Sequence, residues 1–209
     1  LKLRGHKPVI HEKGSQLGGT FIAASAESYK GKLRQLLAWY RRQMEQMEIE
    51  VHLNEEISGT EQFGSDPVII ATGAVPRLPK NVPGYERMIE ACDYLNGAEV
   101  GETVAVICGG LTGCEIAYEL ALQGKKPVIV EMKDDLIAQK GVCLANSSYL
   151  REWFALHKVP VYLETTLKEV GEKAIVCPGK VEPNRNLPAD PCKPSKAKIP
   201  KPRRPKENT

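Results

Sequence analysis

Short apolar runs recur along the chain and predict a series of β-strands. Several of these runs are rich in Val and Ile and are bounded by Gly, Pro or charged residues, as expected for strands buried in a parallel sheet. The predicted strands cover residues 7–12, 50–53, 67–73, 103–107, 127–131 and 159–163. A β-hairpin or meander is expected to begin within residues 166–177.

Helical periodicity fills several intervals between these runs. Residues 28–47 place apolar side chains at three-and-four spacing, which predicts one buried helix face. That face consists of Leu33, Leu36, Leu37, Tyr40, Met44 and Met47. Two more helices are expected, one from the glycine-rich turn at 108–113 to Gln123 and one from Ser147 or Ser148 to about His157. This alternation predicts an α/β fold with a doubly wound parallel sheet of the Rossmann type.

Residues 178–209 differ in kind from the rest of the chain. They hold eight prolines, and nine Lys and Arg against three Asp and Glu, while residues 1–177 carry a net charge of −3. This composition offers little to bury and predicts a disordered basic tail. Because the tail has no aromatic residue for stacking on bases, we expect no nucleic-acid partner. A non-native terminus is the competing explanation.

Composition excludes several classes of protein. Hydrophobic residues make up 42% and charged residues 26% of the 209 residues, as in ordinary globular proteins. No apolar run approaches the roughly 20 residues that span a bilayer, so no membrane association is expected. The six cysteines form no CxxC pair, and no His lies at metal-ligand spacing, so we predict neither a metal site nor a disulfide framework. Scattered thiols suit a reducing cytoplasm, which is the expected location.

One segment, TVAVICGGLTGCEIAYELALQGKKPVIVEM at 103–132, has the layout of a dinucleotide-binding unit. Strand, glycine turn, helix and strand are followed by an acid, Glu131, 18 residues after Gly113. Gly110 would let the backbone approach a pyrophosphate, and the N–H groups of the first helical turn would attract that anion. The predicted nucleotide-binding residues are Cys108, Gly109, Gly110, Leu111, Thr112, Gly113 and Glu131. A glycine turn without a ligand is the competing interpretation.

Two positions in this unit bear on the cofactor. Cys108 stands in place of the first motif glycine, where a side chain would strain the turn or crowd the cofactor. It is either a redox thiol or a small residue that fills the turn. Glu131 would accept hydrogen bonds from ribose hydroxyls and repel a 2′-phosphate, and the adjacent Met132 and Lys133 offer no arginine. We therefore predict NADH as the cofactor in preference to NADPH.

Three segments taken together resemble the C-terminal part of the NADH:flavin oxidoreductases, the relatives of 2,4-dienoyl-CoA reductase, trimethylamine dehydrogenase and enoate reductase. These segments are GHKPVIHEKGSQLGG, PVIIATGAVPRLP and VAVICGGLTGCEIAYELALQGKKPVIVEM, and the resemblance covers about residues 4–177. It implies an FAD domain interrupted by an NAD(P) domain, the nested arrangement of the pyridine nucleotide-disulfide oxidoreductases. By this resemblance residues 1–100 belong to the FAD-binding domain, which continues at 166–177, and residues 101–165 form the NAD(H)-binding domain.

The same resemblance implies positions that bind FAD. Glu12 matches the acid that holds the adenosine ribose of FAD. Gly18 and Gly19 match the glycine pair that lies along the pyrophosphate. The ATG segment, Ala71, Thr72 and Gly73, matches the chain that passes close to the flavin nucleotide. Each also has a plainer interpretation, as an exposed acid at a strand end or as glycines that serve only a turn.

The activity implied is hydride transfer from NADH to FAD, followed by electron transfer through an Fe–S centre and FMN to an enoate- or enoyl-type substrate. The implied partner is an upstream FMN- and Fe–S-binding barrel domain. We expect the chain to be truncated at its N-terminus and to lack the first FAD-binding motif. Whether this chain binds FAD is therefore left open, and we expect the chain alone to be inactive. The alternative is a non-catalytic nucleotide-binding Rossmann-like module. No catalytic acid, base or nucleophile is assigned.

Overall fold

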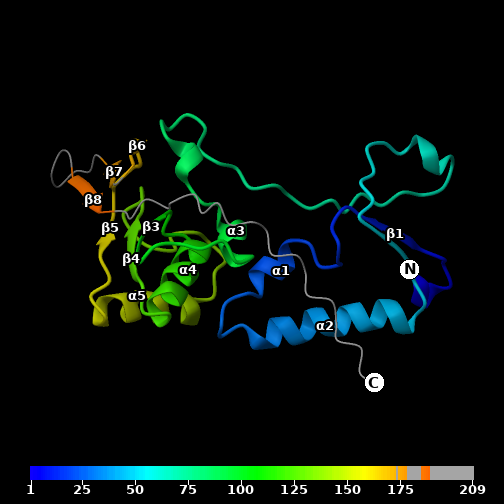
Figure 1. The fold of residues 1–209 in the computed structure, drawn as a ribbon. Coiled ribbons are helices and arrows are strands. Elements are labelled where there is room, and N and C mark those ends of the chain that lie inside the picture. Colours follow the sequence, from blue (N-terminus) through cyan, green and yellow to red (C-terminus); the bar gives the residue numbers. More distant parts are fainter. Residues whose placement is uncertain (173, 178–184, 189–209) are drawn as a thin grey trace, which may run out of the picture.

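The computed structural model describes residues 1–172, 174–177 and 185–188. The chain forms two α/β parts, one before and one after a long extended connection (Figure 1). The predicted α/β fold with Rossmann-like parallel sheets is confirmed, because each part contains a parallel sheet whose strands are joined by helices.

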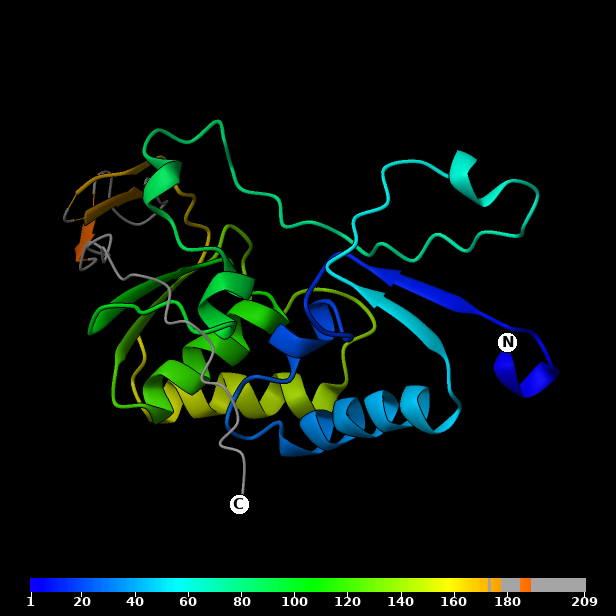
Figure 2. The same ribbon diagram turned by 45° about the vertical axis from the view of Figure 1, so that its right-hand side comes forward.

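The second part is built on a three-stranded parallel sheet. Its strands are β3 (Thr103–Ile107), β4 (Lys126–Val130) and β5 (Val161–Tyr162), in the order β3-β4-β5. α4 (Leu111–Leu122) connects β3 to β4, and α5 (Leu144–Leu156) connects β4 to β5. Each parallel pair therefore has the helical crossover that parallel strands require. α4 packs against β3 and β4, and α5 runs beside α4 (Figure 2).

The main hydrophobic core lies between this sheet and its two helices. Leu120 from α4, Phe154 from α5 and Ile129 from β4 are fully buried, as is Cys114 on the first turns of α4. Burying side chains of this size is worth about 1.5–3 kcal/mol each, so this part has most of the packing that holds the fold together.

The start of α5 differs from the expectation. The helix begins at Leu144, directly after Cys143, and Ser147 lies inside it with a buried side chain. The hydroxyl of Ser147 donates to the carbonyl oxygen of Leu144 at 3.1 Å. The predicted cap at Ser147 or Ser148 is wrong because Ser147 bonds back along an established helix and does not cap a new one.

The first part contains a two-stranded parallel sheet. β1 (Val9–Glu12) pairs with β2 (Glu50–Leu53), and a short 3-10 turn, η1 (Lys2–Arg4), precedes them. α1 (Thr20–Ala24) and α2 (Gly31–Gln46) connect the two strands. Both strands and the long helix occupy their predicted places, whereas the five-residue α1 is too short for its periodicity to show in the sequence.

The apolar face predicted for α2 is only partly buried. Leu37 is 7% exposed, but Leu36 is 38% and Tyr40 is 48% exposed. Of the remaining members, Leu33, Met44 and Met47 are half-buried. A helix of 16 residues is about 24 Å long, whereas two strands about 4.8 Å apart make a much narrower surface. The sheet that the structure describes therefore cannot cover the whole face.

The strand predicted at 67–73 does not form. This segment is extended without a ladder, and Ile69 and Ile70 are 69% and 75% exposed. In both views the chain that follows η2 (Glu61–Phe63) runs on the β1 side of the two-stranded sheet (Figures 1 and 2). An apolar composition favours a strand, but a strand forms only where a neighbour offers backbone groups in register. None does so among the described residues.

The rest of the connection contains one 3-10 turn and one short helix. η3 (Tyr85–Arg87) is followed by α3 (Ala91–Leu95), which contacts α1 of the first part. No helix was predicted here, because a five-residue helix spans less than two turns and shows no clear periodicity.

The chain after the second part forms a small antiparallel sheet. Its strands are β6 (Glu169–Val170), β7 (Ala174–Cys177) and β8 (Arg185–Pro188), so the hairpin expected in 166–177 is confirmed. β8 lies in the tail predicted to be disordered, and that prediction is wrong for 185–188. Backbone pairing with β7 needs no apolar side chains, and Pro188 stands at a strand end where proline is tolerated. The remainder of the predicted tail lies outside the described residues.

Two broad features follow from the described residues. No helix among them combines the length and apolar character needed to cross a membrane. The same part of the chain contains no group of three or more His, Cys, Asp or Glu side chains arranged to hold a metal ion.

Candidate nucleotide-binding site

The glycine turn between β3 and α4 leaves the N-terminus of α4 uncapped. Gly110 is the N-cap residue, with extended backbone angles (φ −69°, ψ 179°), and no side chain caps the helix. The first intrahelical bond runs from the Cys114 N–H to the Gly110 carbonyl oxygen at 2.9 Å. The N–H groups of the first turn, at Leu111, Thr112 and Gly113, therefore point out of the helix end, where the helix dipole favours an anion.

Gly109 and Gly113 of this turn lie in close contact with neighbouring atoms, whereas Gly110 is more open. A Cβ on Gly113 would collide with the carbonyl oxygen of Cys108, so only glycine lets α4 start this close to the turn. A Cβ on Gly109 would stand 2.5 Å from Cδ2 of Leu136. At Gly110 the nearest atoms are side-chain ends, Oε1 of Gln139 at 3.3 Å and Sγ of Cys108 at 3.7 Å. The face of Gly110 is thus the part of the turn that a ligand can approach.

Glu131 follows β4 directly and faces the turn. Its side chain is 5% exposed, its Oε2 accepts from the Gly109 N–H at 2.6 Å, and its Oε1 accepts from the Lys133 N–H at 2.8 Å. A carboxylate has about four acceptor positions, so each oxygen keeps one position for a further donor such as a ribose hydroxyl. The structure therefore brings the predicted acid and the predicted turn together.

Cys108 adopts a backbone conformation that normally requires glycine. Its φ is +93°, its N–H donates to the Val130 carbonyl oxygen at 2.8 Å, and its side chain is exposed. The side chain thus leaves the turn on the solvent side, next to Gly110, and does not fill the turn. Strain of about 1–2 kcal/mol is expected for a non-glycine residue in this region. Cys114, by contrast, is buried, and burial raises the pKa of its thiol to about 12.

The positions implied for FAD lie at the end of β1. Oε1 of Glu12 accepts from the Gly14 N–H at 2.6 Å. Gly18 (φ +134°) packs against α2, where a Cβ would meet the Leu37 side chain at 2.9 Å. A Cβ added to Gly19 (φ +49°) would meet no atom within 4 Å, so its backbone faces open space. Both glycines have positive φ, and Gly19 also has the open approach that a loop along a phosphate chain requires.

The ATG segment at residues 71–73 does not pair with β1 or β2. Ala71, Thr72 and Gly73 are exposed, and Gly73 has a left-handed φ of +70°. A Cβ at Gly73 would meet no neighbouring atom, so crowding does not require glycine here. The left-handed backbone conformation is what favours it. Their role toward a flavin nucleotide stays a prediction.

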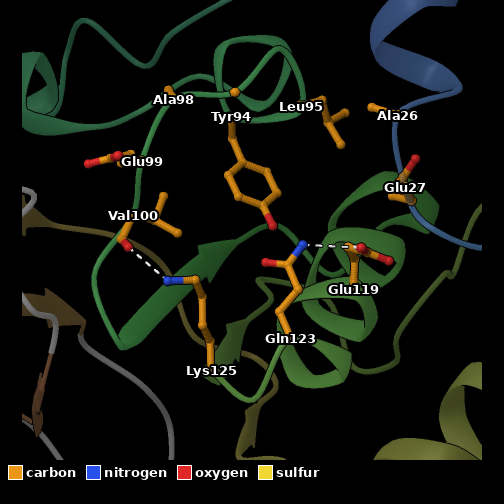
Figure 3. Close-up of a pocket in the computed structure, with 11 residues that line it drawn as sticks. Ala26, Glu27, Tyr94, Leu95, Ala98, Glu99, Val100, Glu119, Gln123 and Lys125 are labelled. Atoms are coloured by element: carbon orange, nitrogen blue, oxygen red, sulfur yellow. Dashed lines mark hydrogen bonds between the residues drawn. The ribbon is translucent and has the colours of Figure 1, made fainter. Parts of the chain in front are cut away.

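A separate hollow of about 450 Å³ lies between the two parts, toward the C-terminal end of α4 (Figure 3). None of the predicted site residues lines it, and no sequence pattern pointed to it because its walls come from distant segments. Tyr94 points into it, and burial together with the charge of Glu119 raises the pKa of that phenol. Its lining residues are Ala26, Glu27, Tyr94, Leu95, Gly97, Ala98, Glu99, Val100, Glu119, Gln123 and Lys125.

The carboxylates at this hollow bind the two parts to each other. Oε2 of Glu119 accepts from the Ser28 N–H at 3.2 Å and from the Ser28 hydroxyl at 2.8 Å. Nζ of Lys30 lies 2.8 Å from Glu115 and 3.2 Å from Glu27. Burial alone would lower the pKa of Lys30, but these two carboxylates outweigh it and raise the pKa. We interpret this cluster as an internal polar contact between the two parts of the fold.

Comparison with known proteins agrees with this geometry. Residues 6–191 match the family described as pyridine nucleotide-disulphide oxidoreductase. Cinnamate reductase of Clostridium sporogenes is 34% identical over 178 residues, which cover 83% of this chain and 27% of that protein. NADH oxidase of Thermoanaerobacter brockii is 35% identical over 142 residues, or 64% of this chain and 22% of that protein. The chain thus spans about a quarter of the length of these relatives.

The solved structures agree on the fold. A 2-naphthoyl-CoA reductase superposes with a TM-score of 0.80 at 23% sequence identity, covering 90% of this chain and 29% of that one. The predicted resemblance to the FAD/NAD(P)-binding region of the NADH:flavin oxidoreductases is confirmed by these matches. The family match also runs beyond residue 177 to residue 191, past the end predicted for the folded region. The chain belongs to the pyridine nucleotide-disulphide oxidoreductase family.

Proposed function

We propose that this chain binds NADH at the N-terminus of α4, as the nucleotide-binding region of an NADH-dependent flavin oxidoreductase. The observation that carries the proposal is the pairing of an uncapped helix N-terminus with a buried acid that faces the same turn. The N–H groups of Leu111, Thr112 and Gly113 bind the pyrophosphate, and Gly110 gives it room. Glu131 binds the hydroxyls of the adenosine ribose.

Preference for NADH over NADPH follows from how Glu131 is held. Both of its oxygens accept backbone hydrogen bonds, so the carboxylate cannot swing away to admit a 2′-phosphate. A carboxylate held in this position repels a phosphate placed on the same ribose. The exposed Lys133 lies beside it, but a lysine is a point charge and lacks the bidentate geometry of arginine.

FAD is the proposed hydride acceptor, and the residues around β1 are proposed to hold its adenosine end. Glu12 binds the ribose, the backbone of Gly18 and Gly19 lies along the pyrophosphate, and the segment 71–73 passes the flavin nucleotide. FAD supplies the capacity to take up hydride, which no side chain can provide. The contribution of this chain is to bind and orient the two nucleotides.

The substrate of the complete enzyme is proposed to be an enoate- or enoyl-type compound. Support comes from the cinnamate reductase relative and from a relative named multifunctional alkene reductase/demethylase, 28% identical over 172 residues, from Caballeronia cordobensis. Because the chain spans 27% and 25% of these proteins, the chemistry on the alkene is assigned to an FMN- and Fe–S-binding barrel domain. This chain by itself is not proposed to reduce the substrate.

A second candidate, a nucleotide-binding module that holds NADH without flavin, is favoured by one observation. Residues 67–73, which include the segment implied for flavin contact, are exposed and unpaired. FAD added to the purified chain and removed by gel filtration distinguishes the two. Retained absorbance near the flavin bands, bleached by NADH, supports the oxidoreductase. A colourless chain whose unfolding temperature rises with NADH supports the module. A chain that responds to neither nucleotide contradicts both.

A further inference from the structure

Arg151 on α5 reaches the segment that covers the glycine turn. Its Nε donates to Oδ1 of Asp135 at 3.1 Å, and its Nη2 donates to Oδ2 of Asp135 at 2.9 Å. Nη2 also donates to the Leu136 carbonyl oxygen at 2.5 Å. Isolated surface ion pairs contribute little, but a bidentate pair with an added carbonyl bond fixes the guanidinium plane and the chain it holds.

The segment held by Arg151 contacts the turn at Gly109. The Ile137 N–H donates to the Gly109 carbonyl oxygen at 2.8 Å. Leu136 is 5% exposed and packs closely on Gly109, where an added Cβ would stand 2.5 Å from Cδ2 of Leu136. Ile137 itself has φ +51°, a strained conformation for a β-branched residue. Such strain persists only where the surroundings enforce it, and the bond from Arg151 to the preceding carbonyl is one such contact.

Gly109 is thereby held at both its N–H and its carbonyl oxygen. Glu131 accepts from the N–H, and the segment fixed by Arg151 donates to the carbonyl oxygen. The next residue, Gly110, is the N-cap position of α4, so the orientation of Gly109 sets the direction of the first N–H groups of the helix. It also sets the distance between those groups and Glu131.

We propose that Arg151 is a positioning residue of the dinucleotide site, an inference that rests on the NADH site proposed above. Acting through Asp135 and Leu136, it keeps the glycine turn in the geometry that meets pyrophosphate and ribose together. Removing it lets the segment and the Gly109 carbonyl move before the ligand binds. The cost of restoring the geometry then falls on the binding step and lowers affinity.

The test compares NADH dissociation constants, measured by titration calorimetry on the full chain, for the wild type and four variants. Arg151→Ala is expected to bind about tenfold more weakly, which corresponds to about 1.4 kcal/mol. Asp135→Asn is expected to weaken binding less, and Arg151→Lys is expected to restore part of the loss. Arg87→Ala is the matched control, because Arg87 also donates to a carbonyl oxygen, that of Val170 at 3.2 Å, on a distant 3-10 turn.

Amide hydrogen exchange gives a readout that a general loss of stability would not produce. In Arg151→Ala the Ile137 amide should exchange faster, while the amide of Ile129 in the core should keep its protection. Wild-type affinity in both Arg151→Ala and Asp135→Asn would overturn the positioning role and leave the NADH site standing. Equal weakening in Arg87→Ala would also overturn it. A wild-type chain that binds no NADH would overturn the proposed function and this inference together.

Discussion

The backbone N–H of Gly109 donates to Oε2 of Glu131 at 2.6 Å, so the acid that follows β4 is tied to the turn that precedes α4. The two residues are 22 positions apart in sequence. Because adjacent parallel strands end at the same edge of a sheet, the turn after β3 and the residue after β4 meet there. This one contact joins the phosphate-binding and ribose-binding halves of the proposed site.

The close start of α4 predicts a large cost for any side chain at Gly113. In Gly113→Ala the new Cβ meets the Cys108 carbonyl oxygen, and backbone cannot give way as a side chain can. We expect a loss of about 1–3 kcal/mol in the free energy of unfolding, measured by urea denaturation. Gly31→Ala is the control, since its Cβ would meet only Nη2 of Arg34 at 3.7 Å. An unchanged midpoint for Gly113→Ala would contradict the described turn.

The left-handed conformation of Cys108 predicts that glycine is better tolerated there than cysteine. Cys108→Gly removes backbone strain of about 1–2 kcal/mol and adds unfolded-state entropy of about 0.5–1 kcal/mol. The expected net gain in unfolding free energy, measured by urea denaturation, therefore lies between zero and about 1.5 kcal/mol. Cys108→Ala keeps the strain and should show no gain. If both variants gained equally, the effect would come from the thiol and not from the backbone.

The contact between Ser28 and Glu119 predicts that the two parts of the fold are coupled. Ser28→Ala removes a hydroxyl that donates to a buried carboxylate at 2.8 Å, which should cost about 1.5–3 kcal/mol. Ser15→Ala, in the exposed loop after β1, is the matched control and should be neutral. Limited proteolysis within 67–84 should also be faster in Ser28→Ala, and equal rates in both variants would argue against the coupling.

Burial of Cys114 predicts a loss of stability at alkaline pH. Burial raises the pKa of this thiol to about 12, above its ordinary value of 9.0, so the folded state keeps a proton that the unfolded state releases. The stability is complete below about pH 9 and falls as the pH rises from there toward 12. Unfolding free energies of the wild type and Cys114→Ala between pH 8 and about 10.5 check this. A slope that is as steep in the variant would exclude Cys114 as its source.

The fold of the proposed nucleotide-binding part could be predicted from the sequence because its information is local. A strand, a glycine turn, a helix and a terminal acid occur within 103–131, and each is encoded by neighbouring residues. The strand at 67–73 was predicted wrongly because an apolar run carries propensity only, while pairing depends on a partner strand elsewhere. The buried face of α2 was overestimated for the same reason, since burial depends on the width of the sheet beneath it.

Contacts between distant segments had no sequence signal. The pairing of Arg151 with Asp135 joins α5 to a loop 16 residues earlier, and an arginine on a helix usually marks a solvated face. The Ser28–Glu119 contact spans 91 residues. Neither pair lies at a spacing that a helix or strand period would reveal, so only the folded arrangement shows them.

The proposed NADH site is tested most sharply by a calorimetric titration of the wild type and Gly110→Ala with NADH and NADPH. Gly110 has φ −69°, which alanine adopts freely, and an added Cβ would meet only the ends of the Gln139 and Cys108 side chains. The variant should therefore unfold at the wild-type temperature, while its methyl group stands where the pyrophosphate must approach. We expect the wild type to bind with NADH preferred, and NADH affinity to be at least about tenfold weaker in Gly110→Ala. Equal NADH affinity in the two proteins, or preference for NADPH in the wild type, would contradict the proposed site.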